Sequence, residues 1–416
     1  MNKRQFLKVA ATAPLVLTSD FSSSPAFSAA LSTSGAEDEA FWSKIRAQFR
    51  LTSEYINLEN GFYCFQPEPV FDRFVENARA LNLEAAHYLR TRSNDDELGI
   101  RRKLAAFAGC SATELIVTRN TTESLDTVIN GFDWRAGDEA VMAAQDYGSM
   151  LDMFTLVSRR HGMVNRVVDV PLDPKSDGEV VEVYARAITS RTRLLMVSHM
   201  INITGQILPV RAICEMAHAR AVPVMVDGAH TFAQLDFRLP DLQCDYFGAS
   251  LHKWLCAPLG TGILYVREDR IGKLWPVYGD ASFPDTDIGK LNHMGTHPVH
   301  SVLTIERALA FQEMIGNARK ERRLRYLQEY WTRQVRGHPT IVVNTPSQSE
   351  RACAIANVGV RGVAPGDLAR MLLEDHKIFT VAIDSAGVRG VRVAPQIYTS
   401  LDELNALVAA LKQIAS

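Results

Sequence analysis

The sequence predicts an α/β fold with a mostly parallel central β-sheet that helices cover on both faces. Short apolar runs rich in β-branched residues recur through the first two thirds of the 416-residue chain, which is typical of buried strands. Helical stretches separate these runs, and strands that alternate with helices favour parallel pairing. The chain length and an apolar fraction of 47% indicate a core large enough for two domains.

The predicted elements follow one another from residue 115 onward. Strands are expected at residues 115–118, 140–144, 164–170, 194–198, 222–226, 244–249 and 263–266. Helices are expected between them, for example at residues 121–131, 149–160, 179–188 and 210–220. In such sheets ligands bind beyond the carboxyl ends of the strands. The polar residues that follow each strand are therefore the candidates for a functional site.

The pattern changes after residue 300. Residues 301–336 form one long helical pattern rich in Arg and Glu, and residues 340–416 read as strand, strand, helix, strand, strand, helix. The basic run at residues 319–323 indicates a solvated helix face rather than a nucleic-acid patch, because no aromatic residues are interleaved with it. We predict a large domain over residues 59–300, and a small α+β domain from residues 37–58 and 301–416 that includes the connecting long helix.

Composition narrows the functional class. A charged fraction of 22% and a net charge of −2 exclude a bulk field for nucleic acid or an anionic membrane. The six cysteines show no metal-binding spacing, so most are expected to be buried core thiols, and no metal site is expected; they stand at positions 64, 110, 214, 244, 256 and 353. A disulfide stays an open alternative if the protein is exported.

The amino terminus has the pattern of an export signal. A basic start at residues 2–8 precedes a short apolar run at residues 9–17 and a small-residue stretch at residues 25–30. This pattern predicts a signal peptide over residues 1–30, and the apolar run is too short to span a bilayer. The sequence K-R-Q-F-L-K resembles the twin-arginine motif, with Lys3 in place of the first Arg. We expect a periplasmic protein exported by the twin-arginine route, with an ordinary Sec signal or a merely frayed basic terminus as the alternatives.

Two polar residues give the strongest indication of chemistry. Asp227 ends one apolar strand, and Lys253 follows another within S-L-H-K-W. Pyridoxal 5'-phosphate (PLP) chemistry requires such a pair, because the amine holds the cofactor as a Schiff base and the carboxylate keeps the pyridine nitrogen protonated. The pair predicts an enzyme that acts on amino acids. The alternative is a turn-capping Asp beside an unpartnered Lys, which is costly for a buried ammonium.

Further motifs follow in order along the chain. They are N-L-E-N-G at residues 57–61, N-T-T-E-S at 120–124, D-Y-G at 146–148, S-H-M-I-N-I-T-G at 198–205, D-G-A-H at 227–230 and G-V-R-V-A-P-Q-I-Y at 390–398. Together they resemble the class V aminotransferase family of fold-type I PLP-dependent enzymes, in particular its isopenicillin-N-epimerase-like branch. The layout is also similar to exported PLP enzymes of siderophore maturation. The resemblance implies a three-layer α/β/α PLP-dependent transferase fold (type I) with a small C-terminal domain.

The resemblance implies a phosphate site. Thr121 and Thr122 open a helix, where free backbone N–H groups favour an anion, and Ser250 and His252 are implied as further phosphate ligands. Thr296, in a G-T pair, is implied to reach the phosphate bound by the neighbouring subunit of a homodimer. A simple helix cap at the two threonines and a simple loop at Thr296 are the alternatives.

Other residues are implied to hold the cofactor ring. Tyr147 takes the place of the aromatic residue that stacks on the pyridine, and Asn202 would hydrogen-bond the ring O3'. His230 stands where desulfurases carry Gln, near O3' and the imine, and Asp227 would pair with the ring nitrogen. Lys253 would bind the cofactor and later carry the Cα proton. His199 is expected to be a local structural hydrogen-bonding residue.

Arg392 is implied to bind the substrate carboxylate with its guanidinium fork. The motif departs from the family pattern, since Ala394 replaces Ser and Thr399 replaces Asn. Arg389 lies close in sequence and could compete for the role.

The resemblance favours an aminotransferase acting on an amino acid or a peptide-linked amino group, with an epimerase and then a β-lyase as alternatives. Cysteine desulfurase chemistry is disfavoured, because residues 377–379 hold no cysteine and the nearest, Cys353, lies in a strand-like run. A transcriptional regulator is also disfavoured, because no helix-turn-helix segment precedes residue 57. A binding protein without turnover would be expected to lack Lys253 or Asp227. The expected partner is a small amino-acid-type substrate, without nucleic acid or stable membrane insertion.

Overall fold

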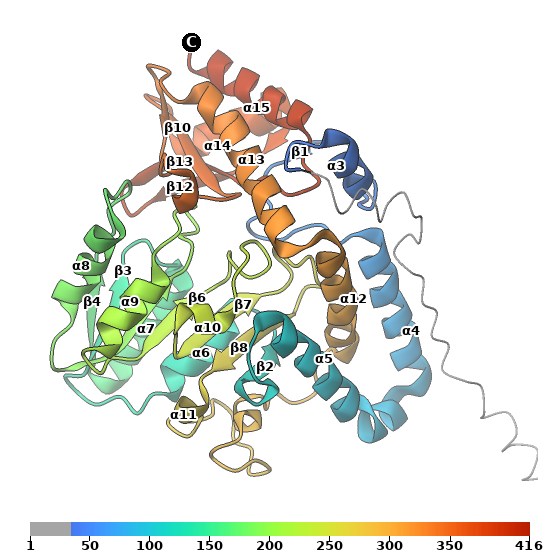
Figure 1. Ribbon diagram of the computed structural model, residues 1–416, viewed down its shortest axis with the longest axis vertical. Coiled ribbons are helices and arrows are strands. Elements are labelled where there is room, and N and C mark those ends of the chain that lie inside the picture. The colour runs from blue at the N-terminus through green and yellow to red at the C-terminus, as the bar shows by residue number, and fades with distance from the viewer. Residues whose placement is uncertain (1–34) are drawn as a thin grey trace, which may run out of the picture. The chain divides into compact units, whose positions relative to one another are not determined.

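The computed structural model describes residues 35–416 (Figure 1). The predicted signal peptide lies outside the described residues. Within the described part, no helix is both long and apolar enough to cross a membrane.

A seven-stranded sheet forms the centre of the large domain (Figure 1). Its order is β2 (Leu115–Thr118), β8 (Gly262–Val266), β7 (Tyr246–Ser250), β6 (Val224–Asp227), β5 (Thr192–Ser198), β3 (Glu139–Ala143) and β4 (Val164–Val168). Strand β8 runs antiparallel to both of its neighbours, and the other adjacent pairs are parallel. The predicted mostly parallel sheet is therefore confirmed.

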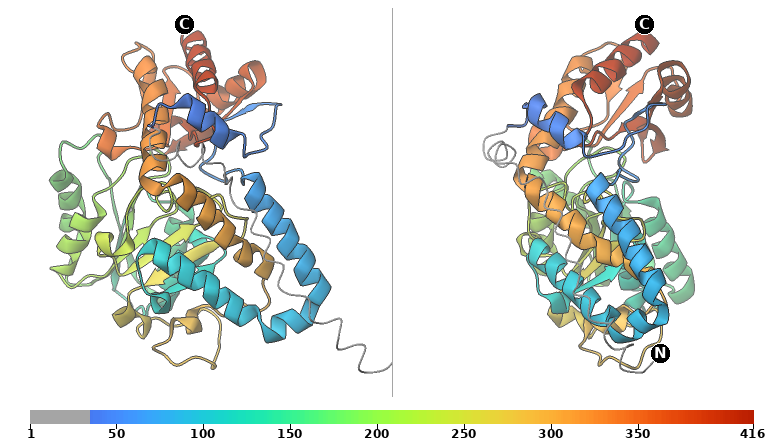
Figure 2. Two further views of the ribbon diagram at one scale, coloured as in Figure 1. Left: turned by 45° about the vertical axis from the view of Figure 1, so that its right-hand side comes forward. Right: turned by 90° about the vertical axis from the view of Figure 1, so that its right-hand side faces the viewer.

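Helices flank this sheet, as the two views of Figure 2 show. They are α6 (Thr121–Gly131), α7 (Gly148–His161), α8 (Asp177–Ala187), α9 (Val210–His218) and the short α10 (Leu239–Leu242) and α11 (Glu268–Ile271). Short 3-10 turns are η1 (Ala112–Glu114), η2 (Ile288–Leu291) and η3 (Ser349–Arg351). Helix α6 begins directly after β2 because the side chain of Asn120 accepts the Glu123 N–H at 2.9 Å and caps the first turn.

The predicted long helix over residues 301–336 is two helices, α12 (Val299–Ile315) and α13 (Asn317–Val335). Gly316 separates them with a φ of 86°, a conformation that ends an α-helix and that glycine adopts without strain. Helix α12 packs against α4 (Glu68–Thr91) and α5 (Ser93–Ala108).

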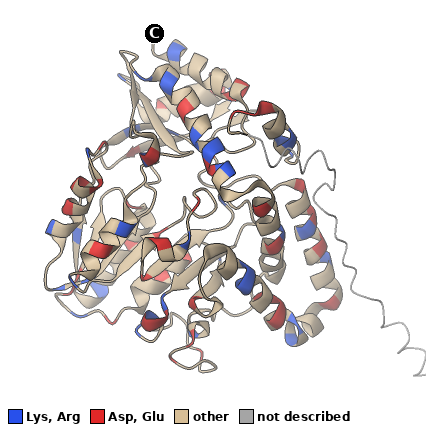
Figure 3. Cartoon of the chain, in the orientation of Figure 1, with Lys and Arg blue, Asp and Glu red and all other residues tan. Residues whose placement is uncertain are grey.

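The prediction that residues 319–323 form a solvated face is wrong for two of the basic residues. Lys320 and Arg323 are each only 1% exposed. The Lys320 ammonium donates to Gln312 Oε1 at 2.8 Å and to the Trp254 carbonyl. Arg323 pairs with Glu39 of α3 (Glu39–Arg46). These charges are buried because tertiary partners, which the helical pattern does not show, satisfy them. Figure 3 shows both basic and acidic residues spread over the helices of the described chain.

The C-terminal part contains an antiparallel four-stranded sheet in the order β12 (Val381–Ser385), β13 (Val388–Val393), β10 (Ala356–Val360) and β9 (Ile341–Val343). Helices α14 (Pro365–His376) and α15 (Leu401–Ile414) belong to this part. The predicted order lacks one short strand, β11 (Ile378–Phe379), which pairs in parallel with β1 (Ile56–Asn57). The N-terminal segment thereby joins the C-terminal part.

Candidate active site

The predicted site residues follow strands that run in one direction. Thr121 follows β2, Tyr147 follows β3, Asn202 follows β5, Asp227 ends β6 and Ser250 ends β7. Because these strands are parallel to one another, their carboxyl ends lie along the same edge of the sheet. This is the edge at which open α/β sheets bind ligands.

Lys253 lies just beyond the end of β7 and faces His230. Its Nζ is 3.3 Å from Nε2 of His230, and Trp254 donates its indole N–H to Nδ1 of the same imidazole at 3.4 Å. Burial lowers the pKa of Lys253 to about 8, the nearby Asp227 acts in the opposite direction, and Arg392 lowers it further. Burial and the neighbouring Lys253 also lower the pKa of His230 well below its ordinary value. The site therefore holds a neutral imidazole beside an amine that is partly unprotonated near neutral pH, as a nucleophile requires.

Asp227 is a buried carboxylate that forms no ion pair with any side chain of residues 35–416. Its Oδ1 accepts the Ala229 N–H at 2.9 Å, and burial raises the pKa of its carboxyl group while Lys253 lowers it. No Arg, Lys or His between residues 35 and 416 forms an ion pair with it. A protonated pyridine nitrogen would supply the missing positive charge, so Asp227 fits the cofactor.

The start of α6 and the end of β7 meet at the predicted phosphate site. Ser250 Oγ accepts the Thr121 N–H at 2.9 Å and lies 2.8 Å from Thr121 Oγ1. Thr122 lines an adjoining hollow together with Tyr278 and Met294. Within residues 35–416 the buried Nδ1 of His252 has no hydrogen-bond partner, and burial lowers the pKa of its ring to about 4. Donors at a helix start, hydroxyl groups and an unsatisfied imidazole nitrogen fit a phosphate.

The remaining ring and phosphate candidates, Tyr147, Asn202 and Thr296, have fewer contacts with the other site residues. Tyr147 stands at the start of α7 and is 42% exposed, so its ring is open to a ligand. The backbone oxygen of Asn202 accepts a hydrogen bond from Arg392 Nη1 at 3.3 Å. Thr296 is exposed before α12, and the described chain shows no hydrogen bond between it and the other phosphate candidates. Its predicted role in a neighbouring subunit stays a prediction.

Arg392, and not Arg389, faces the site. Arg389 lies on the other face of β13, its side chain is 65% exposed, and it pairs with Asp384 at 3.4 Å. The guanidinium of Arg392 is buried and bonds to both carboxylate oxygens of Glu59. The pattern N-L-E-N-G contains Glu59, but a sequence match does not show that its carboxylate meets an arginine 333 residues away.

Two further groups near the site were not predicted to have a role in it. Tyr398 donates its phenol O–H to Asn60 Oδ1 at 2.7 Å, which ties the loop after β1 to the segment after β13. Asp146 accepts the hydroxyl of Ser198 at 2.7 Å and the Ala143 N–H at 2.7 Å, and its burial raises the pKa of its carboxyl group to about 7. These bonds join the ends of β3 and β5, which carry Tyr147 and Asn202.

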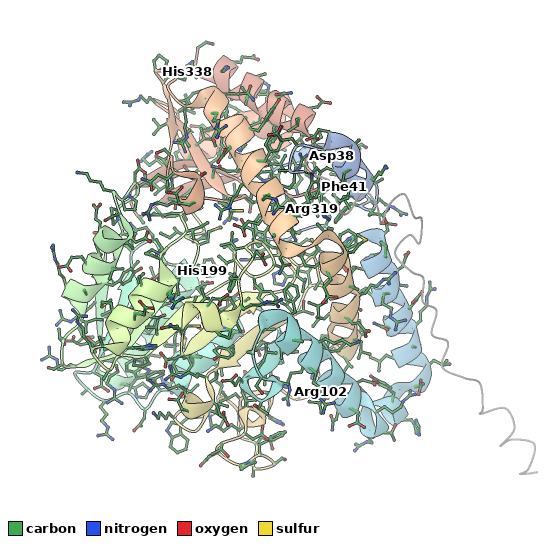
Figure 4. The ribbon with its side chains drawn as sticks, viewed as in Figure 1. Asp38, Phe41, Arg102, His199, Arg319 and His338 are labelled. Atoms are coloured by element: carbon green, nitrogen blue, oxygen red, sulfur yellow. The ribbon has the colours of Figure 1, made fainter. Side chains whose placement is uncertain are left out.

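His199, labelled in Figure 4, is buried beyond the end of β5. Its ring meets Phe237 edge-on with 5.0 Å between centroids, and burial lowers the pKa of the imidazole to about 4. Among the described residues its Nδ1 has no hydrogen-bond partner, and the ring contact with Phe237 is a packing contact.

All six cysteines are free thiols, and five of them are buried. Cys353 precedes β10 instead of lying in a strand, and it packs next to Glu321. Cys64 lies closer to the site, because its N–H donates to the His252 carbonyl at 3.2 Å. Residues 35–416 contain no group of three or more His, Cys, Asp or Glu side chains that could hold a metal ion.

Known proteins with similar sequences cover nearly the whole chain. Isopenicillin N epimerase of Amycolatopsis lactamdurans is 29% identical over 393 residues, which cover 90% of this chain and 98% of the relative. The same enzyme of Streptomyces clavuligerus is 26% identical and covers 89% of this chain and 98% of the relative. A cysteine desulfurase of Pectobacterium atrosepticum is 24% identical and covers 89% of this chain and 97% of the relative.

Solved structures show the same fold. The apo cysteine desulfurase of Thermococcus onnurineus NA1 superposes with a TM-score of 0.79 at 22% identity, covering 89% of this chain and 97% of that one. A C-DES variant with glycine covalently linked to its PLP cofactor gives a TM-score of 0.79 at 22% identity, covering 88% of this chain and 98% of that one. The predicted fold class is thus confirmed.

The sequence profile described as aminotransferase class-V matches residues 66–404, which is most of the chain. The match agrees with the lysine, the strand-end carboxylate and the phosphate-binding candidates described above. The chain therefore belongs to the class-V aminotransferase family and is an enzyme of this PLP-dependent family.

Proposed function

We propose that this enzyme is an aminotransferase that acts on the α-amino group of an amino acid or a peptide-linked amino acid. The observation that carries the proposal is Lys253 with its lowered pKa, placed beside His230 and influenced by Asp227 and Arg392. The amine, the carboxylate and the guanidinium meet at the carboxyl edge of the sheet. The site can therefore bind a substrate amino group and the substituent on its Cα, and remove the Cα proton, within one constellation of side chains.

The residues that fit PLP would contact its phosphate, its ring or the carbon that lysine attacks. Thr121, Thr122, Ser250 and His252 would hold its phosphate, and Asp227 would hold the ring nitrogen. Tyr147 would cover one face of the ring, and Asn202 and His230 would contact its O3' side. Lys253 would hold it covalently. When bound, PLP supplies an electron sink for the electron pair left at the substrate Cα.

The protein side chains then control the proton. Once released from the cofactor, Lys253 Nζ would take the proton from the substrate Cα, because its lowered pKa leaves part of the amine unprotonated and able to accept a proton. The neutral His230 holds the amine at 3.3 Å and fixes its direction. Arg392 lies on the substrate side. Transamination would require Lys253 to deliver this proton to the cofactor carbon next to the substrate nitrogen and not back to the substrate Cα.

An epimerase is the second candidate, since the isopenicillin N epimerases are similar over most of the chain. The same Lys253 would remove the proton, and return to the opposite face of Cα would invert the centre. A β-lyase would use the same residues. Persulfide chemistry is disfavoured, because burial raises the pKa of Cys353 to about 12 and its sulfur packs next to Glu321.

The visible spectrum of the purified holoenzyme tests the proposal. An amino-acid pool is added without any keto acid. Conversion of the lysine-bound cofactor band to the pyridoxamine form supports the aminotransferase. A persistent band together with newly formed D-amino acid, or with incorporation of solvent deuterium at Cα, would instead favour the epimerase.

Lysine variants supply the control for this experiment. Lys253→Ala is expected to lose the lysine-bound band and at least about 100-fold in turnover, since a positioned acid–base group contributes that much. Lys273→Ala changes an exposed lysine after α11 and should retain both. An unchanged spectrum in Lys253→Ala would exclude Lys253 as the attachment point.

We further propose export to the periplasm and a homodimer with Thr296 at a shared site. Support for export comes from the basic and apolar leader in residues 1–30. A reporter fused to residues 1–35 should be exported, and its retention in the cytosol would contradict the proposal. A native mass of one chain for the holoenzyme would contradict the dimer.

A further inference from the structure

Arg392 forms a buried ion pair with Glu59. Arg392 Nε donates to Glu59 Oε2 at 3.1 Å, and Arg392 Nη2 donates to Glu59 Oε1. The two side chains are only 9% and 5% exposed. One carboxylate thus already binds the guanidinium with the two-pronged geometry that a substrate carboxylate would use.

The surroundings hold this pair in place. Arg392 Nη1 donates to the backbone oxygen of Asn202 at 3.3 Å. A Cβ on Gly61 would lie 3.0 Å from the guanidinium carbon, so the backbone of Gly61 lies directly against the charge. Residue 59 is fixed by a parallel bridge to Ala394, one strand position beyond Val393. The backbone on either side of Glu59 is therefore hydrogen-bonded just beyond the end of β13, the strand that carries Arg392. This places the Glu59 carboxylate beside the guanidinium.

The pair has no net charge toward a substrate. Of the acidic residues in the described chain, Glu59 alone forms an ion pair with Arg392. A second carboxylate bound to the same guanidinium would lie beside Glu59, and two like charges in a buried site repel strongly. A free α-carboxylate would have to displace Glu59 or tolerate this repulsion. A neutral amide would do neither.

We propose that Glu59 is a specificity-determining residue that occupies the carboxylate-binding side of Arg392. The enzyme then favours amines whose reacting carbon carries an amide or another neutral group, as at the N-terminal residue of a peptide. Free α-amino acids bind less well because they carry a carboxylate at that carbon. This inference rests on the proposed reaction at an amino group and names its substrate class.

The opposite role for the same pair is a positioning one. Glu59 could hold Arg392 from one side while the remaining N–H groups bind a substrate carboxylate. The two roles predict opposite results when the charge of Glu59 is removed, because a masking carboxylate competes with an anion and a positioning carboxylate supports it.

The test measures binding of propionate and of its neutral analogue propionamide to PLP-loaded enzyme by calorimetry. In the wild type, propionamide should bind at least as tightly as propionate. In Glu59→Gln the affinity for propionate should rise about 10-fold or more, which equals about 1.4 kcal/mol. The affinity for propionamide should stay within about 2-fold of the wild-type value. The gain should vanish in the double variant with Arg392→Gln. Weaker or unchanged propionate binding in Glu59→Gln would overturn the proposal.

Glu139→Gln is the matched control. Glu139 is also a buried carboxylate, paired with Arg166 and Arg191, but it stands at the first residue of β3, at the opposite edge of the sheet from the site. The Glu139→Gln variant should be less stable than the wild type but should bind propionate with unchanged affinity. If Glu59→Gln does not fold, Glu59→Asp keeps the charge one methylene further back and should give a smaller gain. Should neither variant fold, wild-type preference for propionate over propionamide would still refute the proposal.

The result is separable from that for the proposed function. Propionate carries no amino group, so its binding does not depend on turnover. A missing conversion to the pyridoxamine form with both free amino acids and amino-acid amides would refute the aminotransferase and leave the propionate comparison valid. Conversion to the pyridoxamine form together with an unchanged propionate affinity in Glu59→Gln would support the aminotransferase and refute the role proposed for Glu59.

Discussion

At the scale of single residues, the site is defined by how its charges compensate one another. Lys253 loses part of its basicity through burial, and Asp227 and Arg392 act on it with opposite sign. Asp227 has its own pKa raised by burial. A lysine that is partly neutral near pH 8 can attack an aldehyde, whereas an ordinary surface lysine stays protonated there.

The carboxylate of Asp227 should tune the pH dependence of cofactor attachment. The initial rate at which the apoenzyme binds PLP covalently should rise with pH to a midpoint of about 8, because the neutral Lys253 amine is the attacking form. Asp227 stabilises the ammonium, so Asp227→Asn should move the midpoint down by about one pH unit. Stopped-flow absorbance over pH 6 to 10 measures it.

Glu374→Gln serves as the control for this profile, since Glu374 lies on α14 and pairs with Arg370. Its midpoint should equal that of the wild type. A midpoint that stays the same or rises in Asp227→Asn would show that Asp227 does not act on the lysine.

At the scale of elements, the loop after β5 is shaped by a close backbone approach. Gly205 has a φ of 75°, and a Cβ there would lie 2.0 Å from the Ile355 carbonyl oxygen. The neighbouring Gln206 forms a bridge with Ala352, so this loop joins the seven-stranded sheet to the segment before β10. The glycine that closes S-H-M-I-N-I-T-G is required because another chain segment occupies the space of a side chain.

Gly205→Ala should therefore cost more than the left-handed conformation alone. We expect a loss of about 3 kcal/mol or more in the free energy of unfolding, as for other changes that force backbone to move. Gly362→Ala shares a positive φ, 84°, but has open space around its Cβ, and it should lose only about 1–2 kcal/mol. Urea unfolding compares them, and equal losses would contradict the role of the close approach.

At the scale of the whole molecule, the site joins the two ends of the described chain to the central sheet. Glu59 follows β1 and pairs with Arg392 on β13, and Arg392 also donates to the backbone oxygen of Asn202 in the loop after β5. Figure 1 shows the C-terminal sheet above the edge of the large sheet where these strands end. A ligand held between these segments stabilises the folded chain as a unit.

PLP should therefore raise the melting temperature. At 100 times its Kd, a ligand that binds only the folded state adds about 2.7 kcal/mol, which for this chain length corresponds to a Tm rise of about 3 °C. Pyridoxal, which lacks the phosphate, should give a clearly smaller rise because it leaves Thr121, Ser250 and His252 unused. Differential scanning calorimetry decides, and equal rises would argue against the phosphate site.

The sequence by itself determined the fold class and the strand-end candidates. Alternating apolar strands and helices are local patterns, and helix α6 begins and ends at the residues predicted for it. Asp227 follows from the same reasoning, because parallel strands place their carboxyl ends together, whereas Ser250 was implied by the family resemblance. Lys253 was found because its motif is contiguous.

The tertiary structure alone decided which distant charges meet. The long helical pattern gave no sign that Lys320 and Arg323 are buried, since their partners come from elsewhere in the fold. The pairing of Glu59 with Arg392 spans 333 residues, and nothing local to either residue specifies the other. Local patterns follow from the backbone and from nearest neighbours, whereas the compensation of a buried charge depends on the segments that the folded chain brings against it.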